Sequence, residues 1–271
     1  GAGINVAVID TGFRPHADLA ANVVGGHDFI IDPAVANDGG GRDTDAKDPG
    51  DWNTAGGCGT GSGASNSSWH GTHVAGLIGA SATTLRGMAP GVEINVYRVF
   101  GQNGGGATNY AVLKAMILAA DDGCDIVNLS LGGGPVEPIV MEAVRDARDH
   151  GMLVVVAAGN EGRRPVSNPA AYSGATAVSA WGFVGSFPPG SLAEADVLRP
   201  PLSATHQDDF IASFSNYGRQ IAVAELRQDH ALDDDAGQGV GQDGLEPIAD
   251  LDAHLPFGGR DQQDDAVVLV L

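Results

Sequence analysis

Two side chains that could move protons stand in the first third of the chain. Asp10 ends the apolar run Ile4–Ile9, and open α/β sheets place their sites at the carboxyl ends of such buried strands. His70 is the second residue of the stretch Trp69–Ala80, whose small residues and helical apolar spacing predict a helix that begins near this histidine. Each residue also has a plainer interpretation, Asp10 as a turn or cap residue and His70 as a satisfied structural histidine.

His70 and His73 together suggest a metal site as a third interpretation. The usual zinc helix separates its two histidines by four residues and carries a glutamate between them. Here the separation is three residues and no glutamate intervenes. The spacing therefore argues against zinc, and the residues elsewhere in the chain must decide what His70 does.

Carboxylates crowd into the loop region 32–68, which is rich in Asp, Gly and Ser. The aspartates closest together are Asp43, Asp45, Asp48 and Asp51. Hard oxygen ligands at this density suit Ca²⁺, and without a cation they would repel one another. The pattern is not an EF-hand, so a structural calcium ion and a solvated acidic loop both remain open.

The composition narrows the class of protein. A chain of 271 residues can form one large α/β domain with a sizeable core. The formal net charge of −20 argues against a nucleic-acid partner, because the phosphates would be repelled. No apolar run reaches the length of a membrane span and no signal peptide is recognisable, so we expect a mature or clipped monomeric domain without membrane contact. Cys58 and Cys124 are too few for a disulfide framework, which leaves one bridge or two free thiols.

The elements that must position Asp10 and His70 alternate between strands and helices. Apolar or alternating runs predict strands at residues 4–9, 92–100, 125–130, 152–158, 175–180 and 221–224. Helices are expected at about 110–120 and 137–150. This rhythm, with glycines at the strand ends, predicts an α/β fold with a doubly wound, mostly parallel central sheet flanked by helices. Prolines at 188–189 and 200–201 mark a long irregular loop.

Four segments, in order along the chain, resemble the subtilisin-like serine peptidases. They are Val8–Gly12, His70–Gly76, Asn128–Gly132 and Ala157–Asn160. Ala212–Gly218 is similar to a segment found late in that family. The resemblance covers about residues 3–224 and implies the family's fold, peptide-bond hydrolysis in extended polypeptides, a polypeptide substrate or ligand, and secretion.

The resemblance assigns catalytic roles by position. Asp10 would orient and charge-stabilise the imidazole of His70, which would act as the general base. Asn160 would donate its side-chain amide to the developing oxyanion. The Asp-rich loop resembles an insertion in secreted bacterial members that commonly bind calcium, which favours the calcium interpretation.

The resemblance also assigns two peptide-binding segments. The extended residues Ser130, Leu131 and Gly132 would pair with a bound peptide by strand addition. The pocket for the side chain before the cleaved bond would have a wall made of Ala157, Ala158 and Gly159. Small residues leave room there and expose backbone groups, which recognition of an extended peptide requires.

The resemblance ends before the nucleophile. In the family a Gly-Thr-Ser motif opens a buried helix, but this chain has no Ser, Thr or Cys from Asn216 to Leu271. The segment Glu225–Leu271 is strongly acidic and reads as a solvated linker. Its end, Arg260–Leu271, weakly resembles the final strand of bacterial sigma-regulator-type serine phosphatases, whose aspartates help bind Mn²⁺ or Mg²⁺. An unrelated acidic tail is the alternative, and a phosphatase site could not fit in so short a segment.

The sequence therefore predicts two parts: an incomplete peptidase domain over residues 1–224, and an acidic linker with an atypical tail over residues 225–271. We expect the C-terminal part of the fold to be missing or replaced by truncation, frameshift or fusion. Such a chain would not hydrolyse peptides, because it lacks the serine nucleophile. The alternative is a pseudo-peptidase that binds extended peptides without cutting them.

Overall fold

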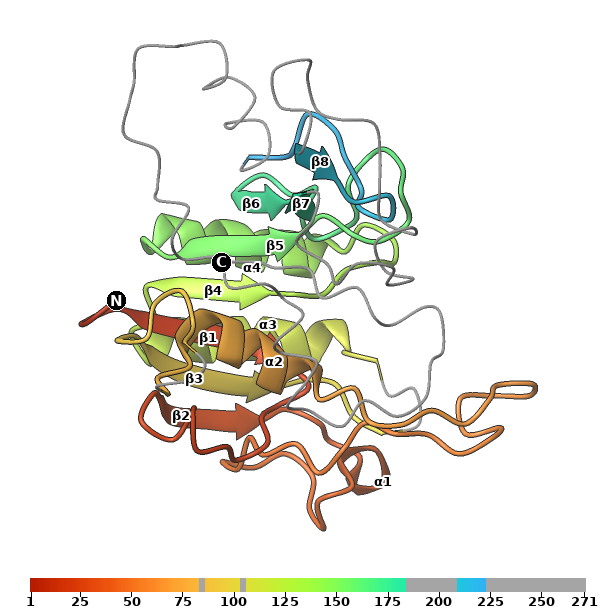
Figure 1. Cartoon of the computed structure of the whole chain (residues 1–271). Helices are drawn as coiled ribbons and strands as arrows, with labels where there is room; N and C mark the ends of the chain where they lie inside the picture. Colours follow the sequence, from red (N-terminus) through yellow and green to blue (C-terminus); the bar gives the residue numbers. More distant parts are fainter. Residues whose placement is uncertain (83–85, 103–105, 184–208, 223–271) are drawn as a thin grey trace, which may run out of the picture.

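The computed structural model of the chain describes residues 1–82, 86–102, 106–183 and 209–222 (Figure 1). The strands of this part are β1 (Asn5–Asp10), β2 (Val23–Asp28), β3 (Glu93–Arg98), β4 (Ile126–Leu129), β5 (Leu153–Ala157), β6 (Ala175–Val178), β7 (Trp181–Phe183) and β8 (Asp209–Ile211). The helices are α1 (Pro33–Ala36), α2 (His70–Gly79), α3 (Asn109–Asp121) and α4 (Pro138–Asp149).

Six strands form one parallel sheet in the order β2-β3-β1-β4-β5-β6. From β1 the chain passes to the edge strand β2 and returns to β3, which lies between β2 and β1; it then crosses to the other side of β1 and continues outward through β4, β5 and β6. A doubly wound sheet of this kind has its switch point beside its central strand, and the carboxyl ends of the strands next to that point form the usual crevice. The predicted α/β class and parallel sheet are confirmed. The strands β7 and β8 form a separate antiparallel pair.

Helices cover both faces of the sheet (Figure 1). The larger core cluster joins α3 and α4 to one face, through residues such as Ala115, Val144 and Tyr97. The smaller cluster joins α2 to the other face, through residues such as Val74 and Ile94. Central strands are therefore buried on both sides, which explains why β1, β4 and β5 read as continuous apolar runs in the sequence.

The predicted elements fall within a few residues of the observed ones, but the edge strand β2 was missed. Its sequence, Val-Val-Gly-Gly-His-Asp, contains two glycines and two polar residues, and it pairs only with β3 among the described strands. An edge strand with open sides needs no continuous apolar run, so the hydrophobic pattern carried no signal. The short elements α1, β7 and β8 were also missed, because none is long enough to show a period.

The structure also bears on the predictions for the last strand, the proline-rich loop, the cysteines and membrane spans. Of the strand expected at 221–224, Ile221 makes an isolated parallel bridge to Ala177, while residues 223–224 lie outside the described part. The proline-rich loop at 187–201 and the tail at 225–271 lie outside it as well. Cys58 is an exposed free thiol and Cys124 a buried one, so the two do not form a bridge. Within the described residues, every helix is too short or too polar to cross a membrane.

Candidate active site

Asp10 and His70, sixty residues apart in sequence, meet at the carboxyl end of β1. His70 Nδ1 lies 2.8 Å from Asp10 Oδ1 and 2.9 Å from Oδ2. The carboxylate is 1% exposed and the imidazole 25%, so the acid is sealed from water while the ring reaches the surface. Because Nδ1 is engaged by the carboxylate, Nε2 is the ring nitrogen that would exchange a proton with a substrate or nucleophile.

The loop after β1 docks helix α2 so closely that only glycine fits at one helix position. A Cβ on Gly71 would lie 2.2 Å from the carbonyl oxygen of Gly12 and 3.2 Å from Asp10 Oδ1. The backbone N–H of Gly71 donates to Thr11 Oγ1 at 3.0 Å, and the N–H of Thr11 donates to Asp10 Oδ1 at 2.7 Å. The helix start and the aspartate are therefore held by one short network, which fixes the orientation of His70.

A buried arginine ends the strand beside Asp10. Arg98 ends β3, pairs in register with Asp10, and is fully buried. Its guanidinium bonds to Asp28 at 2.6 Å, to Asp38 at 3.1 Å and to the carbonyl of Ala36 at 2.6 Å. This group ties the loop after β2 to the same sheet edge. Sequence reasoning missed it, because a charged residue ending a strand looks like an exposed one.

Asn160 lies in the loop that follows β5, at the same edge of the sheet as Asp10. Ala157 and Ala158 are buried at the end of β5, whereas Asn160 is exposed. Since β4 separates β1 from β5, the two strand ends are about 10 Å apart. The fold thus places the predicted oxyanion donor across the sheet edge from the Asp10–His70 pair.

Asn216 clamps the loop that carries Asn160. The side chain is fully buried, and its Oδ1 accepts hydrogen bonds from the backbone N–H groups of Glu161 at 3.2 Å and Arg163 at 3.1 Å. Its own backbone N–H donates to the carbonyl of Gly159 at 2.8 Å. The residues on both sides of Asn160 are therefore bonded to a single side chain and its backbone.

The amide nitrogen of Asn216 completes the clamp. It donates to the carbonyl of Ala158 at 3.2 Å, to Ser167 Oγ at 3.0 Å and to the Glu161 carboxylate. Gly159 has a φ of +104°, and a Cβ there would lie 2.5 Å from this nitrogen. Burial alone would raise the pKa of Glu161, but the hydrogen bonds from Asn216 and Ser167 lower it. Sequence reasoning noticed the segment 212–218 without recognising the role of its asparagine.

The predicted strand-addition segment leaves β4 beside this loop. Ser130 and Leu131 are half-buried and Gly132 is exposed. The next residue, Gly133, donates its N–H to the carbonyl of Asn168 at 2.9 Å, which joins the segment to the loop after β5. The structure therefore brings the two predicted peptide-binding segments together, and β4 places them beside Asp10.

The four aspartates predicted to bind calcium are engaged separately. Each carboxylate accepts a hydrogen bond from a nearby backbone N–H: Asp43 from Asp45, Asp45 from Lys47, Asp48 from Gly50 and Asp51 from Ser68. No three His, Cys, Asp or Glu side chains in the described residues converge as a metal site. These hydrogen bonds shape the loop, and calcium binding by Asp43, Asp45, Asp48 and Asp51 stays a prediction.

Asp48 is the buried member of this group, and its charge is poorly compensated. One oxygen accepts from the Gly50 N–H at 2.7 Å, and the other is buried without a hydrogen-bond partner among the described residues. Burial raises the pKa of Asp48 to about 6 from an ordinary value of 3.8, against the effect of the Gly50 hydrogen bond. A raised carboxyl pKa means that the folded state holds a proton that the unfolded state has lost, so stability falls as pH rises from about 4 to 6.

We therefore expect Asp48→Asn to raise the free energy of unfolding at pH 8 by about 1–3 kcal/mol, the equivalent of up to two pKa units. The gain should shrink to a small part of its pH 8 value near pH 4, where Asp48 is protonated in the folded state and about half protonated in the unfolded chain. Urea unfolding followed by circular dichroism at both pH values measures it. Asp45→Asn, which changes an exposed carboxylate in the same loop, is the matched control. An equal effect of Asp48→Asn at both pH values would rule out ionisation as the cause.

Comparisons with known proteins agree with this geometry. Residues 1–230 match the profile of the Subtilase family. The chain is 41% identical over 238 residues to an extracellular protease of Xanthomonas campestris pv. campestris, covering 83% of this chain and 37% of that protein. It is 32% identical to thermitase of Thermoactinomyces vulgaris, and the match covers 83% of this chain and 63% of thermitase. The solved structure of a protease of Pseudoalteromonas arctica superposes with a TM-score of 0.67 at 37% identity, and the match covers 82% of this chain and 62% of that one. The chain thus spans less than two thirds of these relatives.

Proposed function

The chain belongs to the subtilase family of serine peptidases, and on that premise we propose that it carries the proton-transfer and substrate-binding half of an endopeptidase site. The observation that supports this most directly is the contact between the buried Asp10 carboxylate and His70, whose Nδ1 lies 2.8 Å from Oδ1 and 2.9 Å from Oδ2. In this role Asp10 keeps the ring oriented and stabilises the imidazolium, His70 Nε2 takes the proton of a hydroxyl nucleophile, and Asn160 donates to the oxyanion.

The substrate is an extended polypeptide. Its backbone would lie along Ser130, Leu131 and Gly132 as an added strand, and one side chain would enter beside Ala157, Ala158 and Gly159. The half-exposed segment 130–132 and the glycine at 159 support this proposal. The name of the Xanthomonas relative supports secretion as the place of action.

The second part of the proposal is that this chain does not itself cleave peptides. Residues 216–271 contain no Ser, Thr or Cys, so no hydroxyl or thiol nucleophile follows the Asn216 segment. The alternative function is a peptide-binding module, which is supported by the joined segments 130–134 and 158–168. In both cases Asp10 and His70 form the centre of the site.

A fluorophosphonate probe distinguishes the two outcomes, because it forms a covalent bond only with an activated serine. We expect the intact mass of the full chain to remain unchanged after treatment, while subtilisin treated in parallel gains one adduct. A single adduct that is lost in His70→Ala would show an active nucleophile and refute the proposed inactivity. Fluorescence anisotropy with a labelled extended peptide then tests binding, and Gly132→Pro should weaken it by removing a backbone donor.

Calcium remains a proposal that rests on the sequence pattern alone. If a structural ion is bound, the melting temperature in 1 mM CaCl₂ will exceed that in EGTA, by the linkage of ligand binding to folding. The double variant Asp43→Asn, Asp45→Asn tests two of the predicted ligands that are exposed and hence tolerant of change. Equal melting temperatures in CaCl₂ and EGTA for the unchanged protein would dispose of the calcium proposal.

A further inference from the structure

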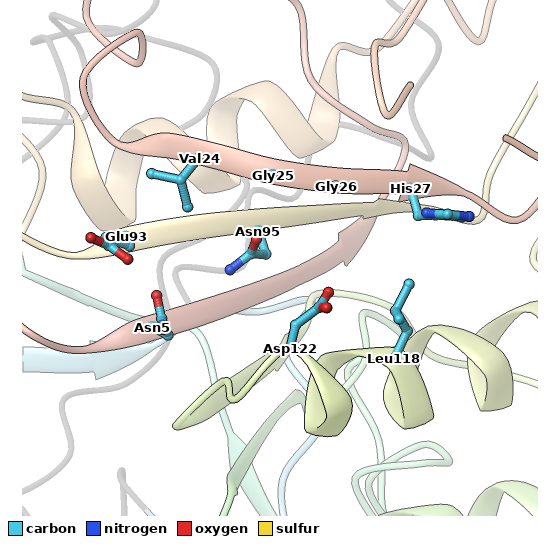
Figure 2. A pocket seen from close by; sticks show the side chains of 9 residues that line it. All are labelled: Asn5, Val24, Gly25, Gly26, His27, Glu93, Asn95, Leu118 and Asp122. Atoms are coloured by element: carbon cyan, nitrogen blue, oxygen red, sulfur yellow. The ribbon is translucent and has the colours of Figure 1, made fainter. Parts of the chain in front are cut away.

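A pocket of about 540 Å³ lies on the α3 side of the sheet and runs from Asn5, at the start of β1, along β2 to His27 (Figure 2). Its floor is made by β1, β2 and β3, and the last turns of α3 form one wall. Asn5, at the start of β1, is separated from Asp10 by five residues of strand, which is about 17 Å. The volume is in the range of small-molecule sites, and no proposed role of the active site uses it.

The sheet surface inside this pocket is polar where the rest of the sheet is apolar. Along β3, Ile94 and Val96 are buried against α2, whereas the alternate residues Glu93 and Asn95 face the α3 side and line the pocket. Gly25 on β2 leaves the space open, since a Cβ there would lie 2.6 Å from Asn95 Oδ1. A parallel sheet normally buries apolar residues on both faces, so this polar, uncovered surface has no role in packing the core.

The polar side chains of the pocket are the carboxylates of Glu93 and Asp122, the amides of Asn5 and Asn95, and the imidazole of His27. Asn5 Oδ1 is buried without a hydrogen-bond partner among the described residues, and Figure 2 shows the side chains of Asn5, Asn95 and Asp122 pointing into the same space. The Asp122 carboxylate accepts one hydrogen bond, from the Tyr97 hydroxyl at 2.6 Å, which leaves further lone pairs to bind a ligand. Glu93 adds a second carboxylate, and among the described lining residues His27 is the one basic side chain, so carboxylates outnumber basic groups in the pocket. The site therefore favours a cation that donates hydrogen bonds.

The chemistry of the lining decides which cation. No three His, Cys, Asp or Glu side chains of the described residues are arranged to hold a metal ion. Leu118 and Val24 supply apolar surface beside the carboxylates of Asp122 and Glu93. An ammonium group on an aliphatic stem satisfies both features, since the head donates three hydrogen bonds and the stem packs on carbon. We propose that the pocket between β1, β2, β3 and α3 binds an alkylammonium group, from either a free amine or a lysine side chain.

The test is a titration of the full chain with pentylamine, followed by amide ¹H–¹⁵N spectra and calorimetry. We expect saturable binding, with shifts at Gly25, Gly26 and Asn95 and none at His70 or Gly71. Pentan-1-ol, the neutral isostere, should not bind. Glu93→Gln should weaken pentylamine about fivefold, because it removes one exposed charge partner. Glu142→Gln, an exposed carboxylate on α4 away from the pocket, should leave the affinity unchanged.

Asp122→Asn gives a second measurement, although it also alters the partner of Tyr97. The double variant Glu93→Gln, Asp122→Asn should abolish measurable binding while its spectrum stays folded. Nα-acetyl-lysine N-methylamide distinguishes the sources: tighter binding than pentylamine indicates a peptide lysine, and weaker binding a free amine. Equal binding of pentan-1-ol, unchanged affinity in Glu93→Gln, or shifts confined to the His70 region would overturn the proposal. None of these readouts depends on peptide cleavage, so they stand apart from the proposed function.

Discussion

Replacing Arg98 by Met is expected to lower the free energy of unfolding by about 3–5 kcal/mol. Arg98 and Asp28 are both fully buried and bond at 2.6 Å. The methionine fills most of the volume of the arginine stem, but it leaves the Asp28 carboxylate buried without its cation and Ala36 without a donor. Breaking a buried pair from one side is costly for this reason, even where the intact pair contributes little to stability.

The pH dependence separates charge from packing in this variant. Burial already raises the pKa of Asp28 to about 6 from 3.8, against the Ile30 hydrogen bond and the charge of Arg98. Without Arg98 the pKa rises further, so the folded variant takes up a proton that the unfolded chain releases. The loss of stability should therefore be greatest at pH 8 and shrink as pH falls toward 6, below which Asp28 is protonated in the folded state of both proteins. Urea unfolding at pH 8 and pH 5 measures this.

Arg148→Met provides the control for Arg98→Met. Arg148 forms an exposed pair with Asp149 on α4, and exposed pairs contribute at most about 1 kcal/mol. A deficit for Arg98→Met that is the same at pH 5 and pH 8 would mean that lost packing, not an uncompensated carboxylate, is responsible.

Replacing Asn216 by Ala is expected to cost about 2–4 kcal/mol of stability and to release the loop that carries Asn160. The substitution removes the acceptor of the Glu161 and Arg163 N–H groups and the donor to Ala158 and Ser167. Hydrogen exchange should show the effect directly, with the amides of Glu161 and Arg163 exchanging at least about tenfold faster, whereas those of α4 follow only the global change.

Two further variants test whether Asn216 acts through this loop. Asn168→Ala removes a weaker exposed bond to Gly134, at 3.3 Å, and should cost less than about 1 kcal/mol. Asn216→Asp places a second carboxylate against Glu161, so the loop should loosen at pH 8, and adding Glu161→Gln should restore its protection. If exchange at residues 161–163 is the same in Asn216→Ala as in the unchanged protein, Asn216 does not hold the loop.

The sequence by itself was sufficient for the parts of this protein whose signal is local. Continuous apolar runs identified β1, β4 and β5, because a strand buried on both faces must be apolar throughout. The small-residue stretch Trp69–Ala80 predicted a helix beginning near His70, where α2 begins, and four ordered motifs identified the family. The resemblance was enough to pair Asp10 with His70, because each lies in a short, contiguous motif whose small residues allow close packing.

Only the tertiary structure decided the features that depend on contacts between distant segments. Arg98 reads as a surface charge in sequence, yet β1 and the loop after β2 bury it beside Asp10. Asn216 becomes a clamp because its segment returns to the loop after β5. The sequence shows only that aspartates crowd into the loop 32–68, whereas the structure shows which backbone N–H group each carboxylate of Asp43, Asp48 and Asp51 accepts from. Hydrogen bonds between residues far apart in sequence leave no periodic pattern in the chain, so the sequence does not reveal them. Such contacts place Arg98 and Asn216 near the site, and the packing of distant strands against α3 forms the pocket.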